Sequence, residues 1–194
     1  MFAKYCVRVR YSLRNFKDKD QAKKLCASAL FCSLIILGAY IKIPLAVPIT
    51  LQLLFTNTAA ITLKKKWGYI PSLLYLLLGL AGLPVFSVGG GIASIISPTF
   101  GFNIGFVIGA AVAGRVADKG TDRSLVLASV LDLLCVYLCG AVYYYFIETL
   151  YFGESLGTYY VISVCVLPFL IPDAVKIALS ITLAKKLKKL SRIP

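Results

Sequence analysis

The amino-acid sequence predicts an all-α integral membrane protein, a bundle of six transmembrane helices with both termini in the cytoplasm. Three observations support this fold class. First, 59% of the 194 residues are hydrophobic, whereas soluble domains usually contain about 45–50% apolar residues. Second, the apolar residues gather in six segments. Third, the basic residues gather in the arm, the tail and every second connection. The length fits one compact bundle and leaves no room for a second, catalytic domain.

Six apolar segments are long enough to consider as membrane spans. The second and third are shorter than the ~20 residues that a helix perpendicular to the membrane needs. Short spans that are interrupted by glycine or proline commonly mark binding sites in transporters. The spans are expected at about residues 25–41, 49–63, 69–83, 100–117, 124–147 and 159–183.

The distribution of charge predicts the orientation of the bundle. Nineteen of the 21 Lys and Arg residues fall in the N-terminal arm, in two alternate loops and in the C-terminal tail. The opposite side of the predicted bundle carries only Lys42, together with Glu148 and Glu154. The positive-inside rule therefore places both termini in the cytoplasm. A nucleic-acid-binding protein would gather its charge on one folded face, so we expect no nucleic-acid partner despite the net charge of +13.

These patterns predict three parts of the chain and a multi-pass location in the cell membrane. Residues 1–24 form a basic cytoplasmic arm, residues 25–186 the six-helix transmembrane domain, and residues 187–194 a basic cytoplasmic tail. The arm lacks the apolar block of a secretory signal peptide, so we expect it to be retained. Two roles stay open for it, contact with an anionic lipid surface or a simple topology signal.

The sequence argues against an enzyme. It contains no histidine, which removes the commonest general base and metal ligand. We therefore expect no catalytic residue, no metal and no cofactor. It also lacks the G-x-x-x-x-G-K-[ST] motif of ATP-binding loops, so any energy from ATP must come through partner proteins.

The segment from Gly68 to Phe106 is the part around which the chain is organised. It begins as a leucine-rich helix that contains Tyr75, breaks near Pro84, and continues as an uncharged glycine-rich stretch that includes Gly90. Irregular backbone at membrane depth is tolerated only where protein or a cavity lines it. We therefore expect this segment to fold over a cavity.

Three ionisable residues fall within or beside the apolar spans, namely Asp132, Asp173 and Lys176. Each is unfavourable there by roughly 2.5–3.5 kcal/mol, so each needs a partner or a cavity. Asp173 and Lys176 are three residues apart and therefore share one helix face. Pro172 fits the first turn of a helix that begins near Asp173. The pair is either an ion pair that neutralises itself or the polar end of a ligand cavity.

Asp132 has no basic residue within four positions. It either stays protonated or accepts a hydrogen bond from Tyr137, a serine or an amide of another helix. A structural hydrogen bond is the interpretation we favour over a role in proton relay.

Neutral polar and small residues supply further candidates. Gln52 and Asn103 place amides inside spans, where amides usually join helices. Ala29 and Ser33 form a pair of small residues four positions apart, which lets another helix approach closely. That helix is either part of the same bundle or part of a partner membrane protein.

The chain also resembles the BioY family, the biotin-specific substrate-binding (S) components of energy-coupling factor (ECF) transporters. The resemblance covers about residues 29–189. It is carried by five segments: ALFCSLIILGAYIKIPL, PITLQLLF, GYIPSLLYLLLGLAGLPVFSVGGG, SPTFGFNIGF and IPDAVKIALSITLAKKLKK. It implies a six-helix bundle that binds biotin from the extracytoplasmic side. A transmembrane coupling subunit and a pair of ABC-type ATPases would then drive import.

The resemblance implies roles for individual residues. Asp173 and Lys176 match polar pocket residues of the family; Asp173 would accept a hydrogen bond from the ureido N–H groups of biotin. Lys176 would donate either to the ureido carbonyl or to the tail carboxylate. The pair Ala29 and Ser33 resembles the alanine-rich face that docks on the coupling subunit. Further ligand-binding candidates are Gln52, Tyr75, Gly90 and Asn103.

The sequence departs from the family pattern at two places. Pro98-Thr99-Phe100-Gly101-Phe102 stands where the family commonly has Pro-Thr-Gly-Gly-Tyr, and Asp132 stands where a small or apolar residue is usual. Two alternatives to an ECF component remain. One is a solitary proton-coupled secondary transporter of biotin or another small vitamin, with Asp132 or Asp173 as proton site. The other is a membrane scaffold that binds no vitamin.

Overall fold

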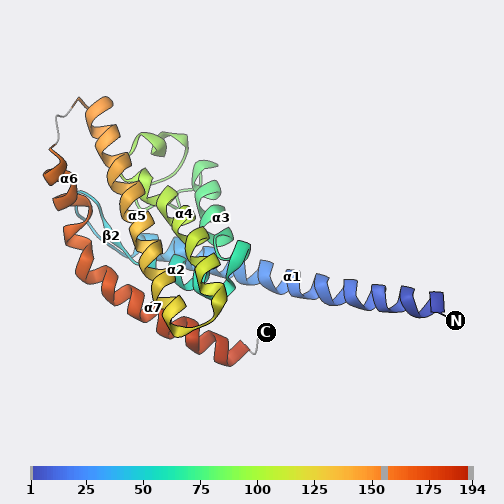
Figure 1. The fold of residues 1–194 in the computed structure, drawn as a ribbon. Helices are drawn as coiled ribbons and strands as arrows, with labels where there is room; N and C mark the ends of the chain where they lie inside the picture. The colour runs from blue at the N-terminus through green and yellow to red at the C-terminus, as the bar shows by residue number, and fades with distance from the viewer. Residues whose placement is uncertain (1, 154–156, 192–194) are drawn as a thin grey trace.

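The computed structural model describes the backbone of residues 2–153 and 157–191, and the side chains of residues 19–153 and 157–189. Glu154 and Arg192, two of the charges used to predict orientation, lie outside the described residues. Helices form nearly all the regular structure in these ranges (Figure 1). The exception is a two-stranded antiparallel ribbon, β1 (Lys42–Ile43) and β2 (Ile49–Thr50), which the sequence did not predict.

Seven α-helices and four short 3₁₀-helices make up the helical part of the described chain. The α-helices are α1 (Phe2–Tyr40), α2 (Gln52–Leu63), α3 (Ile70–Leu80), α4 (Phe100–Val116), α5 (Asp122–Leu150), α6 (Thr158–Cys165) and α7 (Leu170–Ser191). The 3₁₀-helices are η1 (Lys65–Trp67), η2 (Ile92–Ile96), η3 (Ala117–Lys119) and η4 (Leu167–Phe169).

Four segments of the described chain are long and apolar enough to cross a membrane. They are Lys19–Tyr40, Phe100–Lys119, Asp122–Leu150 and Thr158–Lys189. With 12 and 11 residues, α2 and α3 are too short to cross upright. The protein is therefore a multi-pass, all-helical membrane protein. The prediction of six spans is met for four of them, and the shortness of the second and third segments is confirmed.

The central helix of the bundle is α2. It contacts α1, α3, α4, α5 and α7. Five consecutive residues from Thr56 to Ala60 are fully buried, and all have small or short polar side chains. Small side chains let neighbouring helices approach closely. A helix too short to span the membrane is thus surrounded by protein rather than by lipid.

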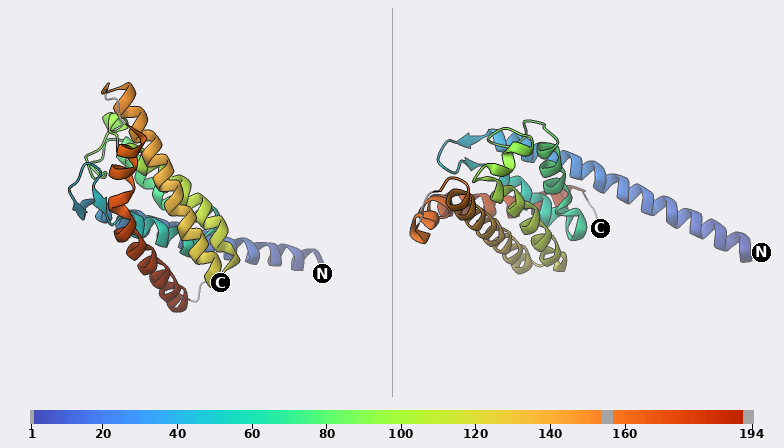
Figure 2. Two further views of the ribbon diagram at one scale, coloured as in Figure 1. Left: turned by 60° about the vertical axis from the view of Figure 1, so that its left-hand side comes forward. Right: turned by 90° about the horizontal axis from the view of Figure 1, so that it is seen from above.

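The helix that begins the chain is longer than predicted. With 39 residues, α1 continues without a break through the predicted boundary between arm and domain at residues 24 and 25. Figures 1 and 2 show its N-terminal part extending beyond the other helices. The division into arm and domain stays a prediction.

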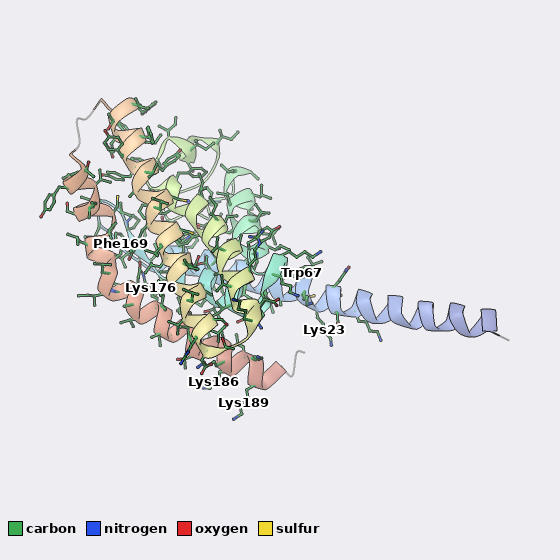
Figure 3. The ribbon with its side chains drawn as sticks, viewed as in Figure 1. Lys23, Trp67, Phe169, Lys176, Lys186 and Lys189 are labelled. Carbon is green, nitrogen blue, oxygen red and sulfur yellow. The ribbon has the colours of Figure 1, made fainter. Side chains whose placement is uncertain are left out.

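The predicted sixth span is two helices. It breaks between α6 and α7 at η4, which contains Pro168. Proline lacks the backbone N–H of a regular helix and interrupts the ladder of hydrogen bonds. The chain resumes as α7, with Pro172 and Asp173 in its first turn, as the sequence predicted. Figure 3 shows Lys176 part-way along α7, well before Lys186 and Lys189 near its C-terminal end.

The glycine-rich loop between α3 and α4 is partly folded into the core. Phe86 is buried, and its ring packs edge-on against Tyr75 at a centroid distance of 5.3 Å. Val88 and Ile92 are 67% and 74% exposed, but Ser87 and Val88 both line cavities, as expected of a segment that folds over a cavity. Gly89 and Gly91 have φ values of 122° and 90°, which side chains other than glycine rarely adopt.

The most extensive interface between two helices is the one between α4 and α5. Gly101 and Gly105 of α4 make it possible. A Cβ atom on Gly105 would lie 2.8 Å from the Cα of Val136, and one on Gly101 would lie 2.2 Å from the Cβ of Tyr143. Both distances are shorter than van der Waals contact, so a side chain at either position would push the helices apart.

We therefore predict that Gly105→Ala lowers the stability of the purified protein by about 1–3 kcal/mol, the usual effect of overpacking a core. Thermal unfolding in detergent measures this change. The control is Ile108→Ala on the same helix, because Ile108 is 45% exposed. Equal melting temperatures for wild type and Gly105→Ala would contradict the close packing of α4 and α5.

Candidate ligand-binding site

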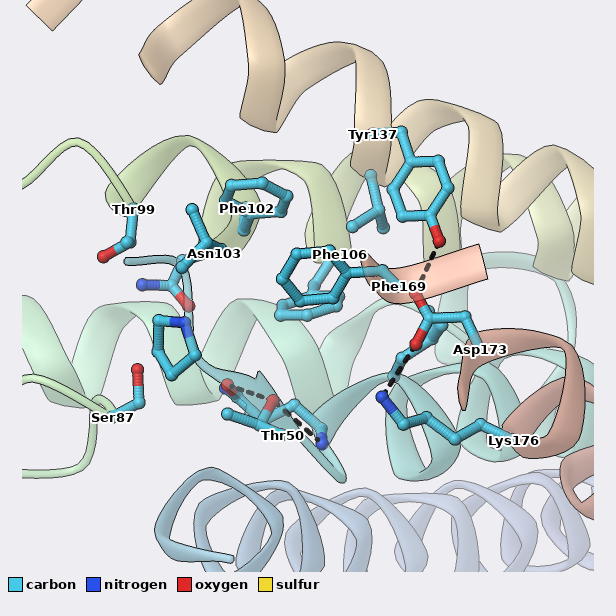
Figure 4. Close-up of a pocket in the computed structure, with 15 residues that line it drawn as sticks. Thr50, Ser87, Thr99, Phe102, Asn103, Phe106, Tyr137, Phe169, Asp173 and Lys176 are labelled. Carbon is cyan, nitrogen blue, oxygen red and sulfur yellow. Dashed lines mark hydrogen bonds and ion pairs between the residues drawn. The ribbon is translucent and has the colours of Figure 1, made fainter. Parts of the chain in front are cut away.

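A cavity lies where α2, α4, α5 and α7 meet the ribbon β1–β2 and the glycine-rich loop (Figure 4). It takes its walls from segments that are far apart in the sequence. The lining residues are Val47, Pro48, Thr50, Gln52, Leu53, Ser87, Thr99, Phe102, Asn103, Phe106, Val136, Tyr137, Phe169, Asp173 and Lys176.

A buried ion pair forms one polar end of the cavity. Lys176 Nζ donates to Asp173 Oδ1 at 2.7 Å, and the Tyr137 hydroxyl donates to Asp173 Oδ2 at 2.8 Å. Asp173 and Lys176 are only 4% and 6% exposed. Both carboxylate oxygens therefore have a donor, as a polar group buried at this depth requires. Lys176 keeps two further N–H groups for a ligand.

Neutral polar groups gather at the other end. Figure 4 shows Ser87, Thr99 and Asn103 on the side of the cavity away from Asp173 and Lys176. These groups offer hydroxyl and amide donors and acceptors without a net charge.

The amide of Gln52 is held in place by its neighbours. Thr50 Oγ1 donates to Gln52 Oε1 at 3.1 Å, and Gln52 Nε2 donates to the Tyr75 hydroxyl at 2.7 Å. Tyr75 is 1% exposed and lies behind Gln52 rather than in the cavity wall. Tyr75 therefore positions Gln52.

Aromatic side chains separate the two polar ends. In Figure 4, Phe102, Phe106 and Phe169 stand between Asn103 and Asp173. The rings of Phe102 and Phe169 stack at a centroid distance of 6.3 Å. An apolar middle between two polar ends matches a small molecule that carries polar groups at both ends of an apolar body.

The end of α1 and the ribbon are both joined to the glycine-rich loop. Lys42 donates to the carbonyl of Ser87, and the Tyr40 hydroxyl donates to the carbonyl of Pro84.

The cavity volume is about 50 Å³, below the roughly 300–1,000 Å³ typical of ligand pockets. Lining side chains or loops must therefore move when a ligand enters.

The structure brings together four of the six residues that the sequence predicted at the site, namely Gln52, Asn103, Asp173 and Lys176. Tyr75 contributes only through Gln52. Gly90 instead lines a second cavity, which shares Thr99 and Asn103 with the first. A Cβ on Gly90 would lie 2.0 Å from the carbonyl oxygen of Leu83, so a close approach of backbone requires glycine there.

Sequence reasoning missed part of the site. It left Tyr137 as a possible partner of Asp132, whereas Tyr137 donates to Asp173. Asp132 lies outside the cavity and makes no hydrogen bond through either carboxyl oxygen. Phe106 and Phe169 carried no signal, because phenylalanine in an apolar span is ordinary. Across the described ranges, no three His, Cys, Asp or Glu side chains lie close enough to hold a metal ion.

The burial of the ion pair predicts a strongly non-additive effect on stability. Lys176→Met should destabilise the protein by about 3–5 kcal/mol, because Asp173 is left as a buried charge without its cation. The double variant Asp173→Leu/Lys176→Met should be more stable than Lys176→Met, since both charges are gone. Chemical denaturation in detergent measures the three proteins side by side. A double variant less stable than Lys176→Met would contradict the buried pair.

Comparison with known proteins identifies relatives of this chain. The model of the BioY family matches residues 11–193. A probable biotin transporter BioY of Pyrococcus horikoshii is 35% identical over 170 residues, which cover 87% of this chain and 98% of that protein. The biotin transporter BioY of Thermotoga maritima is 37% identical over 171 residues, which cover 87% and 97%.

A solved structure has the same fold. It is the crystal structure of the S-component for biotin from an ECF-type ABC transporter, with a TM-score of 0.75 and 25% sequence identity over 88% of this chain and 93% of that chain. The relatives are named as transporters, in agreement with the expectation that this chain is not an enzyme. The extent of the family match and the identities to full-length relatives together show that the chain belongs to the BioY family.

Proposed function

We propose that this protein is the substrate-capture subunit of a biotin uptake transporter. It binds biotin from the extracytoplasmic side, and ECF coupling and ATPase subunits drive the import. Membership of the BioY family and the likeness to a biotin S-component support this function. The observation that carries it is the cavity with a buried Asp173–Lys176 pair at one end and neutral amides and hydroxyls at the other.

The chemistry of biotin matches this cavity. Biotin has a ureido ring with two N–H donors and a carbonyl acceptor, an apolar body, and a carboxylate tail. Asp173 would accept from a ureido N–H, or Lys176 would pair with the carboxylate. The aromatic rings of Phe102, Phe106 and Phe169 would contact the apolar body in either orientation.

The proposed topology has six membrane-inserted segments, with α2 and α3 as the short ones, and both termini in the cytoplasm. The basic loops gather at one end of the bundle. Lys65 pairs with Asp118 at 3.3 Å, and Lys185 pairs with Asp122 at 2.9 Å. Two ion pairs thus connect the loop after α2, the α4–α5 connection and the tail of α7. Such a basic end is typical of the cytoplasmic side.

The outward face of α1 is the proposed docking surface for the coupling subunit. Ala29 and Ser33 are exposed there, whereas Ser28 and Ile35 on the opposite face are fully buried. The Ser33 hydroxyl donates to the carbonyl of Ala29, so neither residue projects far from the helix. This exposure speaks against packing within the bundle and favours contact with another membrane protein.

Calorimetric titration of the purified protein with biotin tests the site. Asp173→Asn and Lys176→Ala should each weaken binding about 10–100-fold, the effect of removing a hydrogen bond to a charged group. The control is Asp122→Asn, the same chemical change in an ion pair exposed at the surface, which should bind like wild type. If both variants bind biotin as tightly as wild type, the protein binds biotin but not through Asp173 and Lys176, and this site is rejected.

Biotinamide, which lacks the carboxylate, distinguishes the two orientations. If Lys176 pairs with the tail, biotinamide binds wild type weakly, and Lys176→Ala no longer separates the two ligands. If Lys176 meets the ureido carbonyl, Lys176→Ala weakens both ligands alike. No binding of biotin to folded wild type would reject the proposed function.

Uptake by vesicles that contain the protein with its coupling and ATPase subunits tests the docking surface. Ala29→Phe should reduce ATP-dependent uptake at least tenfold and leave biotin affinity unchanged, because the bulky ring separates the two subunits. The control is Val126→Phe on α5, because Val126 is 50% exposed. Uptake that survives ATP depletion and collapses with the proton gradient would instead indicate a secondary transporter.

A further inference from the structure

Asp132, Asp173 and Lys176 are the buried acidic and basic side chains in the described part of the bundle. Of these three, Asp132 is the one that does not line the ligand site. It is completely buried in α5, and neither of its carboxyl oxygens has a hydrogen-bond partner. An ionised carboxylate in an apolar interior needs a cation or several donors. A group without either becomes neutral instead.

No cation on the helices packed against Asp132 is available to it. No charged residue occurs in α2, and the one of α4, Arg115, is exposed and donates to the carbonyl of Ala111. On α7, Lys176 is engaged by Asp173, Lys185 pairs with Asp122 at the basic end, and Lys186, Lys188 and Lys189 are exposed. The next titratable group along α5 is a thiol, Cys135, which cannot offer a positive charge.

The surroundings of the Asp132 carboxyl group are also packed too tightly for a metal ion to bind there. Its Oδ1 atom would lie 2.2 Å from a Cβ built on Gly109, so it lies directly against the backbone of α4. A dehydrated metal ion needs several oxygen ligands around it at more than about 2 Å. A proton needs no such space.

The polar side chain that approaches Asp132 is the amide of Asn57 from α2, the helix at the centre of the bundle (Figure 1). The nitrogen of this amide, Nδ2, has no partner. Its oxygen, Oδ1, lies 3.0 Å from the hydroxyl of Ser129 and 3.1 Å from that of Ser180. The amide therefore stands between Asp132 and two serines, one on α5 and one on α7.

Counting protons decides between the two orientations of this amide. The Ser129 hydroxyl lies 2.9 Å from the carbonyl of Leu125, and the Ser180 hydroxyl lies 2.8 Å from that of Ile177. Each hydroxyl has one proton and cannot donate both to its own helix and to Asn57. If the amide oxygen and nitrogen exchange places, both hydroxyls donate to their helices and accept from Nδ2.

That exchange turns the amide oxygen of Asn57 towards Asp132. An ionised carboxylate would be repelled by it, whereas a carboxylic acid donates to it. We propose that Asp132 is a buried proton-binding site: it is a neutral acid at neutral pH that donates a hydrogen bond to the amide oxygen of Asn57. The bound proton then completes a chain of hydrogen bonds from α5 through α2 to Ser180 on α7.

This proton site is connected to the helix that carries the ion pair. Ser180 lies four residues after Lys176 and therefore on the same face of α7. Loss of the proton would turn the Asn57 amide back and draw the Ser129 and Ser180 hydroxyls away from their helix carbonyls. The two buried aspartates thus differ in their surroundings, since Asp173 has two donors and Asp132 has none.

Infrared spectroscopy of the purified protein at pH 7 tests the proposal without any ligand. A protonated carboxyl group has a carbonyl stretch that a carboxylate lacks. Wild type should show this band, and Asp132→Asn should lose it. The matched control is Asp173→Asn, which should keep it. The proposal is overturned if wild type shows no such band, or if the band survives Asp132→Asn.

A second measurement avoids reliance on the variant's folding. Wild-type protein labelled with ¹³C at the side-chain carboxyl of aspartate should show the protonated band at lower frequency. An unshifted band would assign the proton to another residue type and overturn the proposal.

Discussion

Much of this structure depends on the ion pair that Asp173 and Lys176 form inside the bundle. Neither charge is tolerable alone at that depth, and together they still need donors and an enclosing wall. Tyr137 of α5 supplies the second donor to Asp173, so the pair fixes α5 against α7. The break at η4 lets a new helix begin just before Asp173, where its carboxylate also benefits from the helix dipole.

Close packing by small residues is what encloses the pair. Buried α2, with its run of short side chains from Thr56 to Ala60, contacts most of the other helices. Gly101 and Gly105 let α4 lie against α5, so that Phe102 and Phe106 reach the cavity. The packing that closes the core thereby places amides and aromatic rings around a charged end. The geometry of the site is thus a consequence of surrounding the short helix α2 with the other helices of the bundle.

The sequence allowed correct predictions where burying a residue type, such as a charged side chain in an apolar span, costs much free energy. Asp173 and Lys176 were predicted together because two opposite charges three residues apart in an apolar span must either pair or line a cavity. Prediction from the sequence failed where the outcome depends on three-dimensional packing. The ribbon β1–β2 and the inward role of Phe169 depend on contacts between distant segments. The role of Gly90 as a ligand contact stays a prediction, because glycine content cannot tell a ligand contact from a close approach of backbone.

The central claim is that the buried pair is the polar end of a biotin site, and a structure of the protein with biotin bound tests it most directly. The account predicts the ligand between Asn103 and Asp173, with one of its polar groups within hydrogen-bond distance of Asp173 or Lys176. Biotin bound in the second cavity beneath the glycine-rich loop, with the Asp173–Lys176 pair closed and untouched, would contradict the account.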